Sequence, residues 1–130
     1  MAAIIKQVEI DIAPDAAWDA VRDWGAVHKR LCPSVLSDCR VEEEARIVTF
    51  ANGLVARELI VAVDDEARRL VWSVVGTTLL SHHNGAMQVL ASGEGSHIVW
   101  TADLLPHTAA PQVAGLMELG CAAMKATLEG

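Results

Sequence analysis

The sequence predicts an α+β fold in which one long C-terminal helix lies across an antiparallel sheet. Residues 108–130 carry apolar side chains at three- and four-residue steps, which is the spacing of one helix face. Most of the chain before them alternates between apolar and polar residues, as half-buried strands do. The strand-like segments are joined by short polar or glycine-bearing turns, which connect antiparallel neighbours. Because a lone helix cannot bury its apolar stripe, we expect it to pack on this sheet.

Length and charge limit the classes of protein to which the chain can belong. A chain of 130 residues has the size of one domain, so we expect a single domain over residues 1–130. The net charge of −7 argues against nucleic-acid binding, which needs a basic face. The longest apolar run, residues 59–63, is far shorter than the roughly 20 residues that span a bilayer. The first residues lack the features of a signal peptide, so we expect a soluble, cytoplasmic protein without a membrane span.

The first third of the chain predicts a strand followed by two short helices. Residues 4–12 are rich in β-branched side chains and are expected to form the strand. Pro14 and Asp15 suit the first turn of a helix, where proline loses no hydrogen bond and an acid faces the positive end. Gly25 is expected to end that helix, and residues 27–31 are expected to form a second short helical piece. Six further strands are expected in segments 35–43, 46–51, 55–64, 69–75, 82–90 and 96–104.

The last two strands can be placed in register. With residues 92–95 as the turn, Ala91 lies opposite Ser96 and Met87 lies opposite Trp100. One face of this hairpin is then almost entirely apolar, whereas a one-residue slip would destroy the sorting. We take it as the inner face, which contains His83, Gly85, Met87, Val89, Ile98, Trp100, Ala102 and Leu104.

The preceding hairpin, formed by residues 55–64 and 69–75, can be interpreted in two ways. With Asp64 opposite Arg69, the face that carries Trp72 is the preferred inner face. That choice leaves Ile60 and Val71 outside. A bulge would reverse it and bring Glu58 inward. The preferred inner face contains Arg57, Leu59, Val61, Val63, Leu70, Trp72 and Val74.

The order of elements and several short phrases identify a family resemblance over essentially the whole chain. The phrases are residues 12–18, with Ala-Pro-Asp and Trp18, then residues 64–72, and residues 99–103. They resemble the START-like (SRPBCC) superfamily, in particular its polyketide cyclase/dehydrase branch. The resemblance implies a helix-grip fold, in which a curved antiparallel sheet of six to seven strands wraps around the long C-terminal helix, with two short helices after the first strand. It also implies an elongated apolar cavity between sheet and helix.

Two positions depart from the pattern of that family. An aromatic residue usually precedes the proline of the helical segment, whereas Leu31 and Cys32 precede Pro33 here. A tyrosine common near the start of the sixth strand is replaced around His83. The chain contains no tyrosine, which excludes catalysis by a tyrosine hydroxyl.

The implied cavity provides the candidate site. His83, alone among apolar neighbours, is the candidate catalytic acid or base; the alternative is a histidine that hydrogen-bonds at the cavity rim without chemistry. Gly115 and Gly120 in the C-terminal helix suggest a close backbone approach or a bend over the cavity. The candidate ligand-binding residues are Arg57, Leu59, Trp72, His83, Met87, Trp100, Met117, Cys121 and Met124.

Metal and cofactor sites are not expected. His82 and His83 are adjacent on a strand and would point to opposite faces, so they cannot easily share an ion. Cys32 and Cys39 lack the spacing of a zinc motif, and with Cys121 they are expected to be free thiols. The sequence has no glycine-rich phosphate loop, so no nucleotide cofactor is expected.

Three functions remain open at the level of sequence. The first is the binding of a small hydrophobic or aromatic molecule between sheet and helix. The second is a cyclase or dehydratase that uses His83 as acid/base, with Arg57 or Glu58 orienting the substrate; which of these two faces the cavity stays open. The third is a homodimer or partner-binding module that docks through outer apolar positions, namely Ile60, Val71 and Val99.

Overall fold

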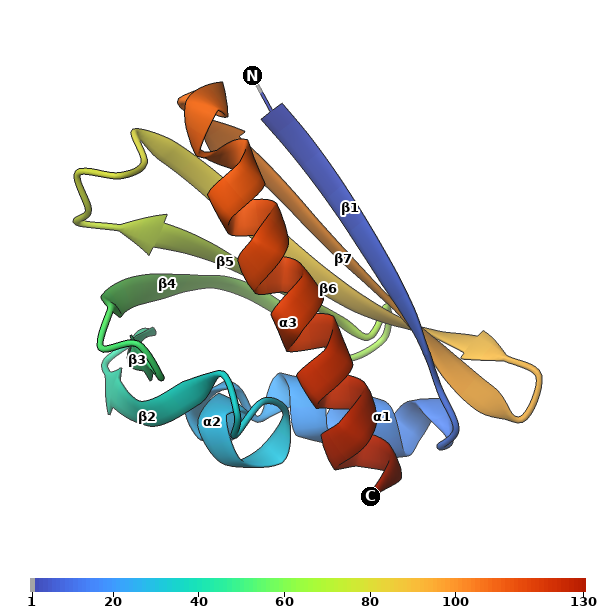
Figure 1. Cartoon of the computed structure of the whole chain (residues 1–130). Helices are drawn as coiled ribbons and strands as arrows, with labels where there is room; N and C mark the ends of the chain where they lie inside the picture. Colours follow the sequence, from blue (N-terminus) through green and yellow to red (C-terminus); the bar gives the residue numbers. More distant parts are fainter. Residues whose placement is uncertain (1) are drawn as a thin grey trace.

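The computed structural model describes residues 2–130, and its elements follow the expected order (Figure 1). Seven strands form one sheet in the order β1-β7-β6-β5-β4-β3-β2, and every neighbouring pair is antiparallel. The elements are β1 (Ala2–Ile10), α1 (Pro14–Arg22), η1 (Trp24–Ala26), α2 (Val27–Arg30), β2 (Leu36–Glu42), β3 (Ala45–Phe50), β4 (Val55–Asp64), β5 (Arg69–Val75), β6 (His82–Ser92), β7 (Gly95–Leu105), η2 (His107–Ala109) and α3 (Ala110–Glu129).

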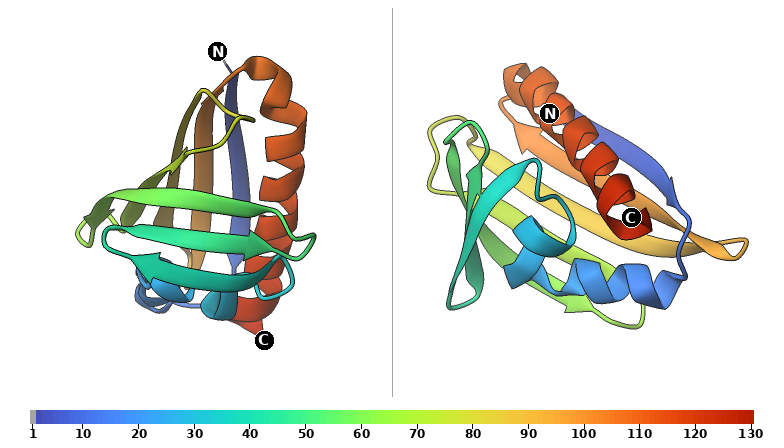
Figure 2. Two further views of the ribbon diagram at one scale, coloured as in Figure 1. Left: turned by 90° about the vertical axis from the view of Figure 1, so that its left-hand side faces the viewer. Right: turned by 60° about the horizontal axis from the view of Figure 1, so that its bottom comes forward.

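The sheet curves around α3, which confirms the predicted helix-grip fold. Figure 2 shows that β2, β3 and β4 run across β1, β7 and β6, and that α3 lies along the concave side of the sheet. α3 begins at Ala110, two residues later than expected, because η2 occupies the turn before it. Its buried residues include Met117, Cys121 and Met124, so the predicted apolar stripe does face the sheet. None of the helices within residues 2–130 is long and apolar enough to cross a membrane.

The first strand is displaced from its expected position. It was expected over residues 4–12 and spans Ala2–Ile10. β1 pairs with β7 from Ala2 opposite Leu104 to Ile10 opposite Ser96. The pairing, and with it β1, ends at Ile10, one residue before the position opposite Gly95 at the start of β7.

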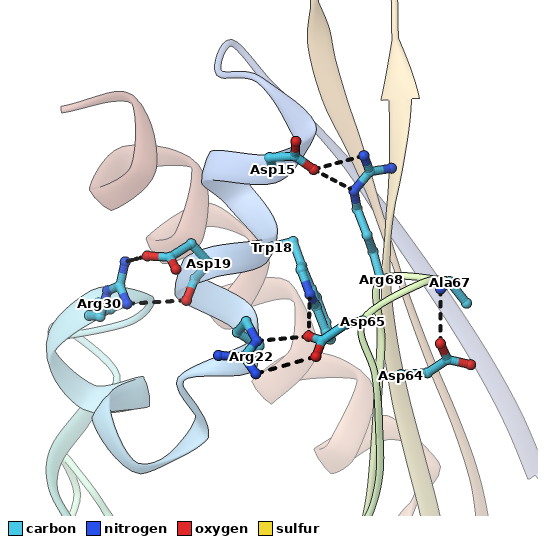
Figure 3. Close-up of polar contacts among 9 residues, drawn as sticks. All are labelled: Asp15, Trp18, Asp19, Arg22, Arg30, Asp64, Asp65, Ala67 and Arg68. Carbon is cyan, nitrogen blue, oxygen red and sulfur yellow. Dashed lines mark hydrogen bonds and ion pairs between the residues drawn. The ribbon is translucent and has the colours of Figure 1, made fainter.

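The helix α1 is fastened to the turn between β4 and β5 (Figure 3). Trp18 Nε1 donates to Asp65 Oδ1 at 2.9 Å, and Arg22 Nε donates to the same oxygen at 2.8 Å. Arg68 Nη2 pairs with Asp15 Oδ1 at 2.8 Å. Pro14 occupies the first turn of α1 and Asp15 follows it, as the sequence predicted. These contacts join α1 to the turn at the end of the β4–β5 hairpin.

The β6–β7 hairpin has the predicted register. Ala91 lies opposite Ser96 and Met87 opposite Trp100. His83, Val89 and Ile98 on the predicted inner face are buried, whereas His82 is exposed. The alternation of apolar residues therefore placed this face correctly.

The β4–β5 hairpin contains a bulge that reverses the preferred face of β4. Asp64 pairs with Arg69 as predicted, but the register shifts between Ile60 and Ala62, which leaves Val61 as an extra residue. Upstream of Val61, Ile60 pairs with Trp72 and turns inward, while Leu59 turns outward and is 41% exposed. The expectation that Leu59 lies on the inner face is wrong for this reason.

The predicted outer apolar surface does not form as described. Ile60 packs against the core instead of facing outward, because of the same bulge. Val71 is buried, and Val99 is half-buried. These three side chains therefore do not make a continuous exposed patch.

Candidate functional site

A cavity of about 160 Å³ lies between the concave face of the sheet and α3. It opens to solvent near residues of its lining that are themselves exposed, namely Val55, Leu79 and Gln112. Most of the lining is apolar. Its polar side chains are Arg46, Glu58, Thr77, His83 and Gln112, and its cysteine is Cys32.

Six of the nine predicted ligand-binding residues line this cavity. They are Trp72, His83, Met87, Trp100, Met117 and Met124. Arg57 and Leu59 do not line it, because the bulge at Val61 turns them to the other face of β4. Arg57 instead pairs with Glu42 on that face, with Nη1 and Oε1 3.2 Å apart. Cys121 is buried in α3 but lies outside the lining.

The two inner tryptophans form one aromatic wall whose position depends on glycine. The rings of Trp72 and Trp100 have centroids 6.0 Å apart and are tilted by 55°. A Cβ atom on Gly85 would lie 2.8 Å from Trp72 Cε2, and one on Gly120 would lie 2.6 Å from Trp100 Cζ3. The close approach expected for the glycines of α3 thus occurs at Gly120, whereas nothing lies within 4 Å of such an atom on Gly115.

A buried ion pair forms the polar end of the cavity. Arg46 on β3 and Glu58 on β4 are direct cross-strand partners, and Arg46 Nε donates to Glu58 Oε1 at 2.6 Å. Their side chains are only 5% and 13% exposed. Arg46 Nη1 also donates to the carbonyl of Trp24 at 3.1 Å, and its guanidinium lies 5.3 Å from the centroid of the Trp72 ring. These contacts satisfy a charge that would otherwise be costly to bury.

His83 is bound to the sheet through its side chain. The backbone pairing of β5 with β6 runs from Arg69 to Trp72, and beyond it the N–H of Val74 donates to His83 Nδ1 at 3.1 Å. The hydroxyl of Ser73 donates to the carbonyl of His83 at 2.5 Å. Because Nδ1 accepts a hydrogen bond, the neutral imidazole carries its proton on Nε2.

Burial keeps the other two ionisable side chains of the cavity lining, His83 and Cys32, uncharged. Loss of solvation lowers the pKa of His83 below its ordinary value, against the opposing negative charge of Glu58. Burial raises the pKa of the Cys32 thiol to about 12, so it is protonated at neutral pH. Within residues 2–130, no group of three or more His, Cys, Asp or Glu side chains is placed to hold a metal ion.

Arg46 is the charged residue of this site that the sequence analysis did not identify. The sequence offered one signal for it, since Arg46 is in phase with Val48 and Phe50 on a strand whose alternate residues face inward. A charged residue at an inward position predicts a buried partner. Glu58, which was expected only as the alternative to Arg57, is that partner.

The chain matches the family described as "Polyketide cyclase / dehydrase and lipid transport" over residues 1–129. No curated protein sequence matches it significantly. The solved structure of XoxI from Bacillus cereus superposes with a TM-score of 0.88 at 19% identity, covering 99% of this chain and 97% of that one. A protein from Thermobifida fusca gives 0.80 at 24% identity, covering 99% and 91%. A point mutant of norcoclaurine synthase from Thalictrum flavum, in complex with a transition-state analogue, gives 0.70 at 15% identity, covering 98% and 93%. These likenesses concern the fold.

Proposed function

The chain belongs to the polyketide cyclase/dehydrase and lipid transport family of the START-like (SRPBCC) superfamily, and on this premise we propose that it binds a small hydrophobic or aromatic molecule. The observation that carries the proposal is the cavity of about 160 Å³ between the sheet and α3, with its mainly apolar lining. An apolar cavity of about 150 Å³ is large enough to accept benzene. The occupant is therefore a molecule of one or two rings, or an aliphatic chain of similar bulk.

The residues that line the cavity suit such an occupant. Trp72 and Trp100 offer ring faces for stacking, and Met87, Met117 and Met124 offer flexible side chains that adapt to shape. The similarly folded norcoclaurine synthase holds a transition-state analogue, which supports a fold that can enclose a small molecule. A cytoplasmic location and homodimerisation stay predictions from the sequence.

The geometry of His83 favours a hydrogen-bond donor over an acid/base catalyst. A general base needs a lone pair directed at the substrate. The only lone pair of the neutral ring lies on Nδ1, where it accepts the N–H of Val74. Nε2 still carries a proton, and a neutral imidazole gives up this proton only to become an unfavourable anion. Turnover of a cyclase or dehydratase type through His83 therefore remains the second candidate, supported by the description of the family alone.

Filling the cavity tests the proposal. A panel of uncharged one- and two-ring aromatic compounds is screened by native mass spectrometry, and compounds that bind are titrated by tryptophan fluorescence. Met117→Trp places a large ring against the cavity and is expected to weaken binding at least about tenfold, because the occupant loses its space. Leu119→Trp is the matched control, since Leu119 lies on the same helix but is 60% exposed.

The control should bind as the unaltered protein does. Equal weakening by Met117→Trp and Leu119→Trp would place the bound compounds outside the cavity. If the unaltered protein bound no member of the panel, the proposed function would fail.

A further inference from the structure

Within residues 2–130, the polar end of the cavity has one hydrogen-bond acceptor and one hydrogen-bond donor without a protein partner. Glu58 uses Oε1 for Arg46, and His83 uses Nδ1 for Val74. Among residues 2–130, no hydrogen-bond partner occupies Glu58 Oε2 or His83 Nε2, and neither atom is sealed from solvent. Both residues line the cavity, and the remaining acceptor oxygen and donor N–H are the groups that they can offer to a ligand there.

These two groups lie at the same level of the sheet. Glu58 is the cross-strand partner of Val74 in the β4–β5 pairing. His83, on the other side of β5, accepts the N–H of that same Val74. The concave face therefore carries the carboxylate and the imidazole on the two sides of one residue, and Trp72 lies on the adjoining inward position of β5.

The charges that line the cavity sum to zero. Arg46 is positive, Glu58 is negative, and the buried His83 and Cys32 are neutral at neutral pH. Arg46 is already paired with Glu58 and the Trp24 carbonyl. An anionic ligand group at this end would add a negative charge without an available counter-ion, and burying an uncompensated charge is strongly unfavourable.

We infer that the cavity selects an uncharged molecule that bears a hydroxyl group, and that Glu58 makes the cavity reject anionic analogues. The hydroxyl hydrogen is donated to the carboxylate of Glu58, and the hydroxyl oxygen accepts the Nε2–H of His83. The ring or chain that carries the hydroxyl lies against Trp72 and the methionines. This inference rests on the proposed function, because it names the class of ligand for the same cavity.

Three probes of nearly equal shape test the inference in the unaltered protein. They are 2-naphthol, 2-methylnaphthalene and 2-naphthoate, titrated by calorimetry at neutral pH, where only the last is charged. We expect 2-naphthol to bind at least about tenfold more tightly than 2-methylnaphthalene, because its hydroxyl can hydrogen-bond to both Glu58 Oε2 and His83 Nε2. We expect 2-naphthoate to bind at least about tenfold more weakly than 2-naphthol, because of its charge.

Removing the negative charge of Glu58 should reverse the preference for 2-naphthol over 2-naphthoate. Glu58→Gln keeps the side-chain shape but leaves Arg46 without its counter-ion, so 2-naphthoate should gain at least about tenfold and overtake 2-naphthol. Glu42→Gln is the matched control, because Glu42 pairs with Arg57 outside the cavity. It should leave the order of the three probes unchanged.

The outcomes separate this inference from the function on which it rests. If 2-methylnaphthalene binds as tightly as 2-naphthol, or 2-naphthoate binds tightest, ligand binding stands and the inference is overturned. If none of the three probes binds while other members of the aromatic panel do, ligand binding stands and the inference is overturned. If no member of the panel binds either, the proposed function fails and the inference fails with it. If Glu58→Gln does not fold, the probe series in the unaltered protein decides alone.

Discussion

The two walls of the cavity are held in place by different forces. On the sheet, Arg46, Glu58 and His83 are each fixed by hydrogen bonds of 2.6 to 3.1 Å to a neighbouring strand or loop. On α3, Met117 and Met124 are held by packing alone, and methionine adapts its shape at little cost. The comparison indicates a rigid polar end that orients a ligand and a soft apolar wall that accepts its shape.

Breaking the rigid wall should have the largest effect on stability. Glu58→Ala leaves the charge of Arg46 buried without its partner, so the free energy of unfolding should fall by about 3–5 kcal/mol. Urea unfolding followed by circular dichroism measures this loss. Replacing both residues, Arg46→Met with Glu58→Leu, should recover most of it, because no unpaired charge remains.

An exposed ion pair provides the control for this loss. Lys6 and Glu118 join β1 to α3 at 2.9 Å, but the Glu118 side chain is 69% exposed. Glu118→Ala should therefore change stability far less than Glu58→Ala. Similar losses for both variants would show that the wall of Arg46 and Glu58 is no more rigid than the surface.

Crowding the soft wall should have an intermediate effect. Gly120→Ala places a methyl group 2.6 Å from Trp100 Cζ3, and overpacking of this kind costs about 1–3 kcal/mol. Gly115→Ala is the matched substitution, since it meets nothing within 4 Å and gains helix propensity of up to about 1 kcal/mol. In thermal unfolding, the midpoint temperature should fall for Gly120→Ala and rise for Gly115→Ala. A raised midpoint for both variants would mean that Trp100 moves aside freely.

The apolar lining of the cavity was predictable from the sequence because it depends on periodicity. Met117 and Met124 fall on the apolar stripe of α3, and Met87 and Trp100 fall on the clean alternation of β6 and β7. The turn between these strands is short, which fixes their register. Periodicity and one turn therefore suffice to place four residues of the cavity.

The rigid wall was not predictable in the same way because it depends on one irregularity and on pairing between strands. Residues 59–63 are all apolar, so their sequence gives no alternation from which the bulge at Val61 could be located. The bulge decides that Glu58, and not Arg57, faces inward. Arg46 joins Glu58 only through the β3–β4 register, and the bond from Val74 to His83 forms only where the β5–β6 backbone pairing ends.

The smallest expected effect concerns the protonation of His83, which belongs to the rigid wall. Burial lowers the pKa of His83 from its ordinary value of 6.5, with Glu58 and Asp103 opposing this shift and His82 adding to it. As pH falls below that value, the unfolded chain takes up a proton that the folded chain resists. Stability is therefore complete above the ordinary pKa and declines on acidification, by at most about 1.4 kcal/mol per pH unit.

His83→Asn tests the origin of this decline, because the asparagine oxygen can still accept the N–H of Val74 but does not titrate. Urea unfolding measured from neutral to mildly acidic pH should show the decline in the unaltered protein and a flatter profile in the variant. His82→Asn removes an exposed neighbouring histidine and should keep the decline. If the profile of His83→Asn matched that of the unaltered protein, protonation of His83 would not be what loosens the polar wall, and the carboxylates of exposed pairs such as Glu9 with His97 would have to account for the loss.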